Sequence, residues 1–200
     1  MRALYRLLLV LLTRMRHAWY RLCLRFQTTA LRGGLNVGKN VLLQVPLRCD
    51  GYGKVSIGDD TAFGSRPAPK AGNGEVLIQA RAAEAVIQIG RNVLFSNNIS
   101  LISTVGITIG DDCLVGDNLL VMDTDFHGIH PAERRTSPGT SRPVTVGKNV
   151  WFGSRVIVQK GVTIGDNSVI ASQSVVTRDI PPNSVAGGNP AKVLRTLDGC

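Results

Sequence analysis

Two of the three histidines, His127 and His130, lie in the stretch DTDFHGIHPAERRTSPGTSRPV, residues 123–144. An imidazole has an unperturbed pKa of about 6.5, which makes it a natural base for removing a hydroxyl proton at neutral pH. Asp123 and Asp125 come just before these histidines, and either carboxylate can orient a ring or bind an acceptor hydroxyl. The plainer interpretation, in which all four are ordinary solvated loop residues, stays open at this point.

This stretch interrupts a six-residue repeat. From Val146 onward the sequence runs V-G-K-N-V-W, F-G-S-R-V-I, V-Q-K-G-V-T, I-G-D-N-S-V, I-A-S-Q-S-V and V-T-R-D-I-P without a gap. A step of six rotates by about 600° on an α-helix and would scatter the aliphatic residues over its faces. On extended backbone the even step keeps them on one face. Because loops longer than roughly 12–15 residues are usually functional or disordered, the interruption is a candidate site.

The repeat predicts a coil of short strands with a corner every six residues. We expect Gly147, Gly153, Gly165 and Asn167 to take the positive φ angles of tight corners. Looser copies of the same phrase begin at positions 36, 56, 88 and 108. Six consecutive hexads are typical of a parallel β-helix. Its flat sides predict packing into a closed oligomer.

Composition narrows the class of protein further. The chain has 200 residues, is 44% hydrophobic and contains no apolar run near the roughly 20 residues of a membrane-spanning helix, which excludes a polytopic membrane protein. Nine of its 23 Lys and Arg lie in residues 1–48, before the first acidic residue, Asp50, and the rest of the chain is neutral. The excess positive charge therefore lies in one apolar segment, which argues against nucleic-acid binding. The four cysteines have no CxxC spacing and predict reduced cytosolic thiols.

Residues 1–30 are predicted to form a basic amphipathic helix, separate from a β-helix domain over residues 31–200. Three- and four-residue steps place one apolar stripe along it, formed by Leu4, Leu8, Leu11, Met15, Trp19, Leu22 and Phe26. Such a helix suits the anionic inner face of the cytoplasmic membrane, where the protein would be peripheral. Docking of the stripe on a neighbouring subunit is the alternative.

The segment NVWFGSRVIVQKGVTIGDNSVIASQSVVTRDIPPNSVAGGNPAKVLR, residues 149–195, resembles the hexapeptide-repeat acyltransferases. It is most similar to the maltose, galactoside and nodulation O-acetyltransferase group and its relatives in surface-polysaccharide clusters. The resemblance extends, more weakly, back to about residue 88 and covers residues 1–50 and 65–87 poorly. It implies an all-β fold, a left-handed parallel β-helix, a homotrimer, and an acyl-CoA bound in a groove between adjacent prisms.

The resemblance also implies roles for individual residues. It places the catalytic base at His127, with His130 as runner-up, and the oxyanion donor at the backbone N–H of Ser154. Asn97 matches an acceptor-site asparagine, with Asn98 as its substitute. Asp123, Asp125 and His130 are the substrate-binding candidates. CoA contacts carry over, within coils 145–195, to Trp151, Ser154, Ser172, Thr177, Arg178, Lys192 and Arg195.

Two departures from the family pattern concern substrates. The triplet 171–173 reads Ala-Ser-Gln where the family favours a glycine-rich sequence, so the pantetheine path is expected to differ. The irregular stretch 65–87, which contains Pro67 and Pro69, interrupts the prism near the expected acceptor end.

The leading hypothesis is an acetyl-CoA-dependent O-acetyltransferase that acts on a sugar hydroxyl of a bacterial surface polysaccharide, or on its lipid-linked or nucleotide precursor. Direct transfer with a histidine base is expected, and acetyl-CoA is the only cofactor. The alternatives are N-acetylation of an amino-sugar nucleotide or antibiotic, and a non-catalytic trimeric scaffold. A γ-type carbonic anhydrase would need three zinc-binding histidines, and His17 lies in the distant helix, so no metal is expected.

Overall fold

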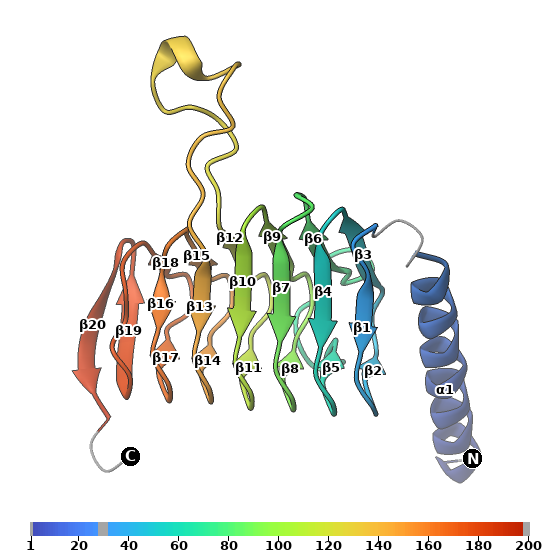
Figure 1. Ribbon diagram of the computed structural model, residues 1–200. Helices are drawn as coiled ribbons and strands as arrows, with labels where there is room; N and C mark the ends of the chain where they lie inside the picture. Colours follow the sequence, from blue (N-terminus) through green and yellow to red (C-terminus); the bar gives the residue numbers. More distant parts are fainter. Residues whose placement is uncertain (1, 28–31, 198–200) are drawn as a thin grey trace.

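The computed structural model describes residues 2–27 and 32–197, and within them short strands wind into a three-sided prism (Figure 1). Each side is a sheet whose strands are parallel, apart from the last strand of the second sheet. Sheet I contains β1 (Leu35–Val37), β4 (Lys54–Ile57), β7 (Val86–Ile89), β10 (Gly106–Ile109), β13 (Val144–Val146) and β16 (Thr163–Ile164).

Sheets II and III form the other two sides. Sheet II contains β2 (Leu42–Leu43), β5 (Ala62–Phe63), β8 (Leu94–Phe95), β11 (Leu114–Val115), β14 (Trp151–Phe152), β17 (Val169–Ile170), β19 (Ser184–Gly188) and β20 (Ala191–Thr196). Sheet III contains β3 (Leu47–Gly51), β6 (Val76–Ala80), β9 (Ser100–Ser103), β12 (Leu120–Met122), β15 (Ile157–Val158) and β18 (Val175–Val176). The chain visits the sheets in the order I, II, III, so each coil has three corners.

The core lies inside the prism and is built by the hexads as predicted. The first position of every hexad from Val146 is buried, and so is the fifth position. Phe63 and Phe95 stack on neighbouring coils with their ring centroids 4.9 Å apart. An interior this narrow accepts small aliphatic side chains with few aromatic ones, which accounts for the composition.

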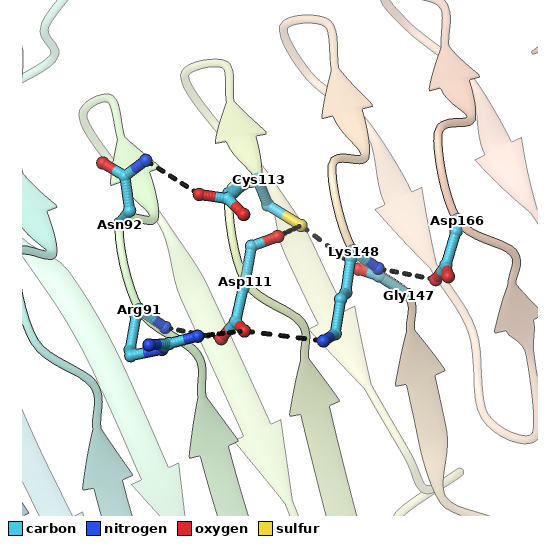
Figure 2. Close-up of polar contacts among 8 residues, drawn as sticks. Arg91, Asn92, Asp111, Cys113, Gly147, Lys148 and Asp166 are labelled. Carbon is cyan, nitrogen blue, oxygen red and sulfur yellow. Dashed lines mark hydrogen bonds and ion pairs between the residues drawn. The ribbon is translucent and has the colours of Figure 1, made fainter. Parts of the chain in front are cut away.

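Polar ladders hold the corners between sheets I and II together (Figure 2). The carboxylate of Asp111 accepts a hydrogen bond from the Arg91 N–H at 2.9 Å, and Asp166 accepts one from the Lys148 N–H at 2.7 Å. One residue further on, the Asn92 side chain donates to Asp112 at 2.8 Å. The pKa of Asp111 is lowered, first by the Arg91 backbone hydrogen bond and then by the nearby cationic side chains, against the opposing effect of burial. Acidic and amide residues recur at these corners because each forms a hydrogen bond with the neighbouring coil.

The glycine expectation was wrong for Gly147, Gly153 and Gly165, none of which has a positive φ, whereas it holds for Asn167 at 59°. These glycines are required by close contact between coils. A Cβ on Gly147 would lie 2.1 Å from a carboxylate oxygen of Asp166. The left-handed corner positions carry side chains, most often Asn or Asp, which tolerate that conformation better than other residues.

Both ends of the prism are covered. Helix α1 (Arg2–Gln27) lies beside the first coil, and the β19–β20 hairpin closes the opposite end (Figure 1). The imidazole Nδ1 of His17 accepts a hydrogen bond from the Leu43 N–H at 3.0 Å. This backbone N–H on the edge strand of the first coil therefore has a partner. In the described part of the chain, α1 included, no helix combines the length and the apolar character needed to cross a bilayer.

Two buried cysteines give a first testable prediction. Burial raises the pKa of the Cys49 thiol to about 12 and that of the Cys113 thiol to about 11. At pH 8 fewer than about one thiol in a thousand is ionised, so neither should react with iodoacetamide until the prism unfolds. Peptide mass spectrometry should find the half-exposed Cys23 alkylated before either of these two. Labelling of Cys49 in the native protein at the rate of Cys23 would contradict this packing.

Candidate active site

The projecting loop, residues 123–143, leaves the prism between β12 and β13, at the corner between sheets III and I (Figure 1). Its only regular element within the described residues is the short 3-10 helix η1 (Pro131–Glu133). The loop begins at Asp123, which is fully buried. The Asp123 carboxylate accepts hydrogen bonds from the Ser103 hydroxyl at 2.6 Å and from the N–H groups of residues 104, 105 and 106 at 2.7–2.8 Å.

This burial argues against the substrate-binding hypothesis for Asp123. The Thr104 hydroxyl also donates to the Asp123 carboxylate, at 3.2 Å. A carboxylate with no exposed surface and five donors already in place has no room for an acceptor hydroxyl. Its backbone carbonyl also accepts a hydrogen bond from the Arg142 N–H at 2.8 Å, at the other end of the loop. Asp123 therefore fixes the base of the projecting loop.

Asp125 lies further out and pairs with Lys160, from the same corner of the next coil. The Thr140 hydroxyl also donates to the Asp125 carboxylate, at 2.9 Å. The pKa of Asp125 is lowered, mainly by the Lys160 hydrogen bond, while partial burial opposes the shift. Asp125 thus clamps the two branches of the loop to the prism.

The clamp predicts the behaviour of a Lys160→Met variant. Because the pKa of Asp125 is lowered in the folded protein, its carboxylate is ionised at every pH above the ordinary aspartate pKa of about 3.9. The ion pair with Lys160 therefore stabilises the folded loop fully at neutral pH, and this stabilisation is lost only as the pH falls through the lowered pKa. Removing the ammonium should speed hydrogen exchange of residues 123–143 about fivefold at pH 7. Mass spectrometry of the loop peptides measures this. Lys148→Met, which removes the exposed partner of Asp111, is the control and should leave loop exchange unchanged. Equal hydrogen exchange of the loop in the two variants would show that the Asp125–Lys160 pair does not hold the loop.

His127 lies at the outer part of the loop and is exposed. Its Nδ1 is 2.9 Å from the backbone carbonyl oxygen of Arg134, across the turn. A carbonyl oxygen only accepts hydrogen bonds, so Nδ1 carries the proton and the Nε2 lone pair is left for another partner. An open hollow of about 560 Å³ surrounds the ring, lined by Asp125, His127, Gly128, Ile129 and Arg134.

His130 has a local structural contact. Its Nδ1 accepts a hydrogen bond from the Ala132 N–H at 3.4 Å, at the start of η1. The two histidines of the loop are thus held differently. His127 is oriented from behind by a carbonyl and presents a free nitrogen, whereas His130 uses its Nδ1 as an acceptor in the turn.

A second group of polar residues lies at the corner between sheets II and III. The Ser154 hydroxyl donates to the Asp117 carboxylate at 2.5 Å, and the Asn118 amide donates to the same carboxylate at 2.7 Å. Burial tends to raise the pKa of Asp117, but these hydrogen bonds outweigh it and the pKa is lowered. The Ser154 N–H, expected as the oxyanion donor, donates instead to the Ser172 hydroxyl oxygen at 3.1 Å. An incoming oxyanion must therefore displace the Ser172 hydroxyl.

Asn97 is fully buried, which argues against its expected role at the acceptor. Its amide nitrogen donates to the carbonyls of Ser65, Ala68 and Pro69 at 2.9–3.1 Å, and its oxygen accepts from the Ser65 N–H at 3.1 Å. With its hydrogen bonds taken by its own chain, Asn97 shapes the irregular segment. Asn98 occupies a left-handed corner with φ 61° and donates to the Ala71 carbonyl.

The expected CoA contacts fall in separate places on one protomer. Trp151 is exposed on the outer face of sheet II, and borders a hollow of about 610 Å³ that is also lined by Arg66, Leu94 and Leu114. Ser154 and Ser172 are at the corner between sheets II and III. Thr177 and Arg178 follow β18 at the corner between sheets III and I, and Lys192 and Arg195 are exposed on β20. The described residues contain no cluster of three or more His, Cys, Asp or Glu side chains able to hold a metal ion.

The candidate groups are therefore divided between two edges of the prism. His127 projects from the corner between sheets III and I, and Ser154 lies across sheet III at the other corner. Figure 1 shows the loop pointing away from its own prism. One copy of the chain therefore does not bring His127 and Ser154 to the same corner.

Sequence reasoning missed the residues that hold this arrangement. In the sequence, Lys160 is indistinguishable from any other corner residue of a hexad. Asp117 likewise resembles the other acidic residues at corners. The available signal for Asp117 is its place directly before Asn118, one coil ahead of Ser154. The Arg134 carbonyl has no signal in the side-chain pattern, because a backbone acceptor is independent of residue type.

Comparison with known proteins agrees with this architecture. The bacterial transferase hexapeptide family (six repeats) matches residues 143–178, and the hexapeptide repeat of succinyl-transferase matches residues 86–122. The galactoside O-acetyltransferase of Escherichia coli (strain K12) is 45% identical over 112 residues, which cover 56% of this chain and 55% of that protein. The chain spans about half the length of the curated relatives it matches.

Two solved structures extend the match. A galactoside acetyltransferase in complex with coenzyme A is 36% identical, with a TM-score of 0.54, and the match covers 70% of this chain and 66% of that one. A hexapeptide-repeat acetyltransferase from Vibrio cholerae, complexed with acetyl coenzyme A, is 26% identical with a TM-score of 0.52 over 86% and 74% of the two chains. The expected all-β, left-handed β-helix fold is confirmed.

Proposed function

Because the chain belongs to the hexapeptide-repeat acetyltransferase superfamily, we propose that it is an acetyl-CoA-dependent O-acetyltransferase acting on a sugar hydroxyl. The single observation that carries the proposal is the imidazole of His127. Its Nδ1–H is bound to the Arg134 carbonyl at 2.9 Å, and its Nε2 is exposed on a loop that projects from the prism. A neutral imidazole held in this tautomer is ready to accept a proton.

The proposed reaction is a direct transfer. The Nε2 of His127 takes the proton of the acceptor hydroxyl as its oxygen attacks the thioester carbonyl carbon. The Ser154 N–H, released from the Ser172 hydroxyl, stabilises the tetrahedral oxyanion. Collapse of this intermediate breaks the carbon–sulfur bond, and the proton held by His127 goes to the departing thiolate. Acetyl ester and free CoA are the products.

The proposed assembly is a homotrimer in which neighbouring protomers share each site. The outer face of sheet II carries a column of apolar side chains across successive coils, formed by Leu42, Ala62, Leu94, Leu114 and Trp151, of which all but Ala62 are exposed. Burying such a column against another prism is favourable. A neighbour packed side by side also brings its projecting loop to a corner that the first protomer's His127 does not reach.

The proposed acceptor is a bacterial surface glycan or its lipid-linked or nucleotide precursor. The hollow at His127 is open and lined by only five residues, so it imposes no enclosing shape on the acceptor. An open site suits a sugar that is part of a larger molecule better than a small free substrate, which needs enclosure for tight binding. In this proposal the protein acts at the inner face of the cytoplasmic membrane.

The test is an acyl-transfer assay with purified protein. Acetyl-CoA is incubated with a panel of galactosides, glucosides and amino sugars, free thiol is followed, and products are identified by mass spectrometry and alkaline lability. An alkali-labile acetyl ester on a sugar hydroxyl supports the proposal. Acetylation only on amino groups would favour the N-acetyltransferase alternative. Failure to bind CoA would leave a scaffold as the better description.

A further inference from the structure

Helix α1 turns its apolar stripe away from the protein that it covers. The face toward the prism is the one with His17, bound to the Leu43 N–H, and Leu24, which is buried in the core. Tyr20 packs against the same core. With 3.6 residues per turn, the side opposite His17 carries the predicted stripe.

Every stripe residue whose side chain is described is exposed, and these are Leu8, Leu11, Met15, Trp19 and Leu22. Leu12, beside the stripe, is exposed as well. Met15 and Trp19 are each 62% accessible. The side chains of Leu4 and Phe26 lie outside the described ones. An apolar strip of this length on a helix is typical of a surface that another phase or molecule covers.

The charge of the segment identifies what covers the stripe. Arg14 and Arg21 are exposed on one flank of the helix, between the stripe and the side facing the prism, and Arg16 lies on the opposite flank. No acidic residue occurs before Asp50. An all-basic border beside Leu and Trp side chains matches anionic headgroups above acyl chains. A second copy of the same stripe would place arginines against arginines.

The direction of the helix fits a bilayer as well. Figure 1 shows α1 running along the strand direction, across the end of the prism. A helix lying flat in a membrane would therefore stand the prism upright on it. The projecting loop leaves the prism between the fourth and fifth coils, about 14–19 Å from the first coil at the usual strand spacing.

We propose that the outward face of α1 is a docking surface for an anionic lipid bilayer, with the Leu, Met and Trp side chains in the interface and the arginines on the headgroups. The bilayer contact does not depend on the catalytic proposal. If the proposed function also holds, bilayer docking places His127 at the height of a sugar that is a few sugar units away from the membrane, as in a lipid-linked glycan. Three such helices on one end of a trimer would act together.

The test is co-sedimentation of the full chain with vesicles of phosphatidylcholine, either pure or containing about one third phosphatidylglycerol. The protein should bind the anionic vesicles, and binding should weaken as salt rises. Arg14→Gln with Arg21→Gln should weaken binding about thirtyfold, at about five- to sixfold per charge. Met15→Ser with Trp19→Ser should abolish most of it. Lys54→Gln with Lys70→Gln removes the same charge elsewhere and should bind normally.

Light scattering and a CoA-binding measurement complete the design. Binding to neither vesicle, with larger oligomers that the Met15→Ser, Trp19→Ser variant dissociates, would show that another copy covers the stripe and would overturn the proposal. Equal binding to both vesicle types would overturn its electrostatic part. His127→Ala should bind vesicles normally, and the stripe variant should still bind CoA. Failure of membrane docking is thus distinguishable from failure of the catalytic proposal.

Discussion

Replacing His127 with alanine should lower the rate of acetyl transfer about 10²–10⁴-fold, the usual contribution of a positioned general base. Nε2 is the ring nitrogen left to act as a base, because Nδ1 is bound to the Arg134 carbonyl. Affinity for CoA should change little, since the ring only meets the acceptor hydroxyl and the thioester. Steady-state kinetics and calorimetric titration with CoA measure the two effects separately.

His130→Ala is the matched control, three residues away on the same loop. Its Nδ1 accepts from the Ala132 N–H and fixes the start of η1. We expect at most a few-fold loss of turnover, because one weak turn contact is removed. A loss in His130→Ala as large as that in His127→Ala would move the base to the runner-up. Unchanged turnover in His127→Ala would remove the histidine mechanism.

The second large effect is expected for Asp123→Ala. The substitution leaves the N–H groups of residues 104, 105 and 106 and the Ser103 hydroxyl without their shared acceptor. Unpaired buried donors cost about 1–3 kcal/mol each, and residue 105 is partly able to find water. We expect a loss of about 3 kcal/mol of stability, or about 6–12 °C in the melting temperature.

Asp112→Ala is the control for this prediction. Asp112 also accepts a side-chain hydrogen bond between coils, from Asn92, but it is exposed at its corner. Its loss should lower the melting temperature by no more than about 2–4 °C. If Asp123→Ala melted like the wild type and only raised the KM for the acceptor, the substrate-binding hypothesis for Asp123 would be restored.

The hexads made the prism predictable because their physics is local. An even step on extended backbone puts Val146, Phe152 and Val158 on one face whatever surrounds them, and all three are buried. The end of the hexads likewise marked the projecting loop. The handedness of the coil came only from resemblance, since the repeat pattern is the same for either hand.

Contacts between coils were beyond the sequence pattern. Nothing in the residue types distinguishes Asp123, which is sealed in a turn, from Asp125, which is clamped by Lys160. Asn97 matched an acceptor residue by position, yet the fold uses its amide for the irregular segment. The Ser172 hydroxyl on the Ser154 N–H follows from stacking two corners, which lie 18 residues apart in the chain.

The amphipathic helix was predictable, but the direction of its stripe was not. The spacing of Leu8, Met15 and Trp19 defines one face and leaves open whether that face packs on the prism. In the structure, His17 and Leu24 contact the prism instead. The face opposite the stripe thus made the intramolecular contact, and the apolar stripe was left outside.

The central claim is that His127 of one protomer meets a thioester held at the Ser154 corner of its neighbour. A crystal structure of the assembled protein with bound CoA tests it most directly. We predict that the CoA sulfur lies between these two groups, with the imidazole Nε2 close enough to share one proton with an acceptor oxygen placed about 3–3.5 Å from the thioester carbon. A sulfur seated far from every His127 ring in the assembly would contradict it.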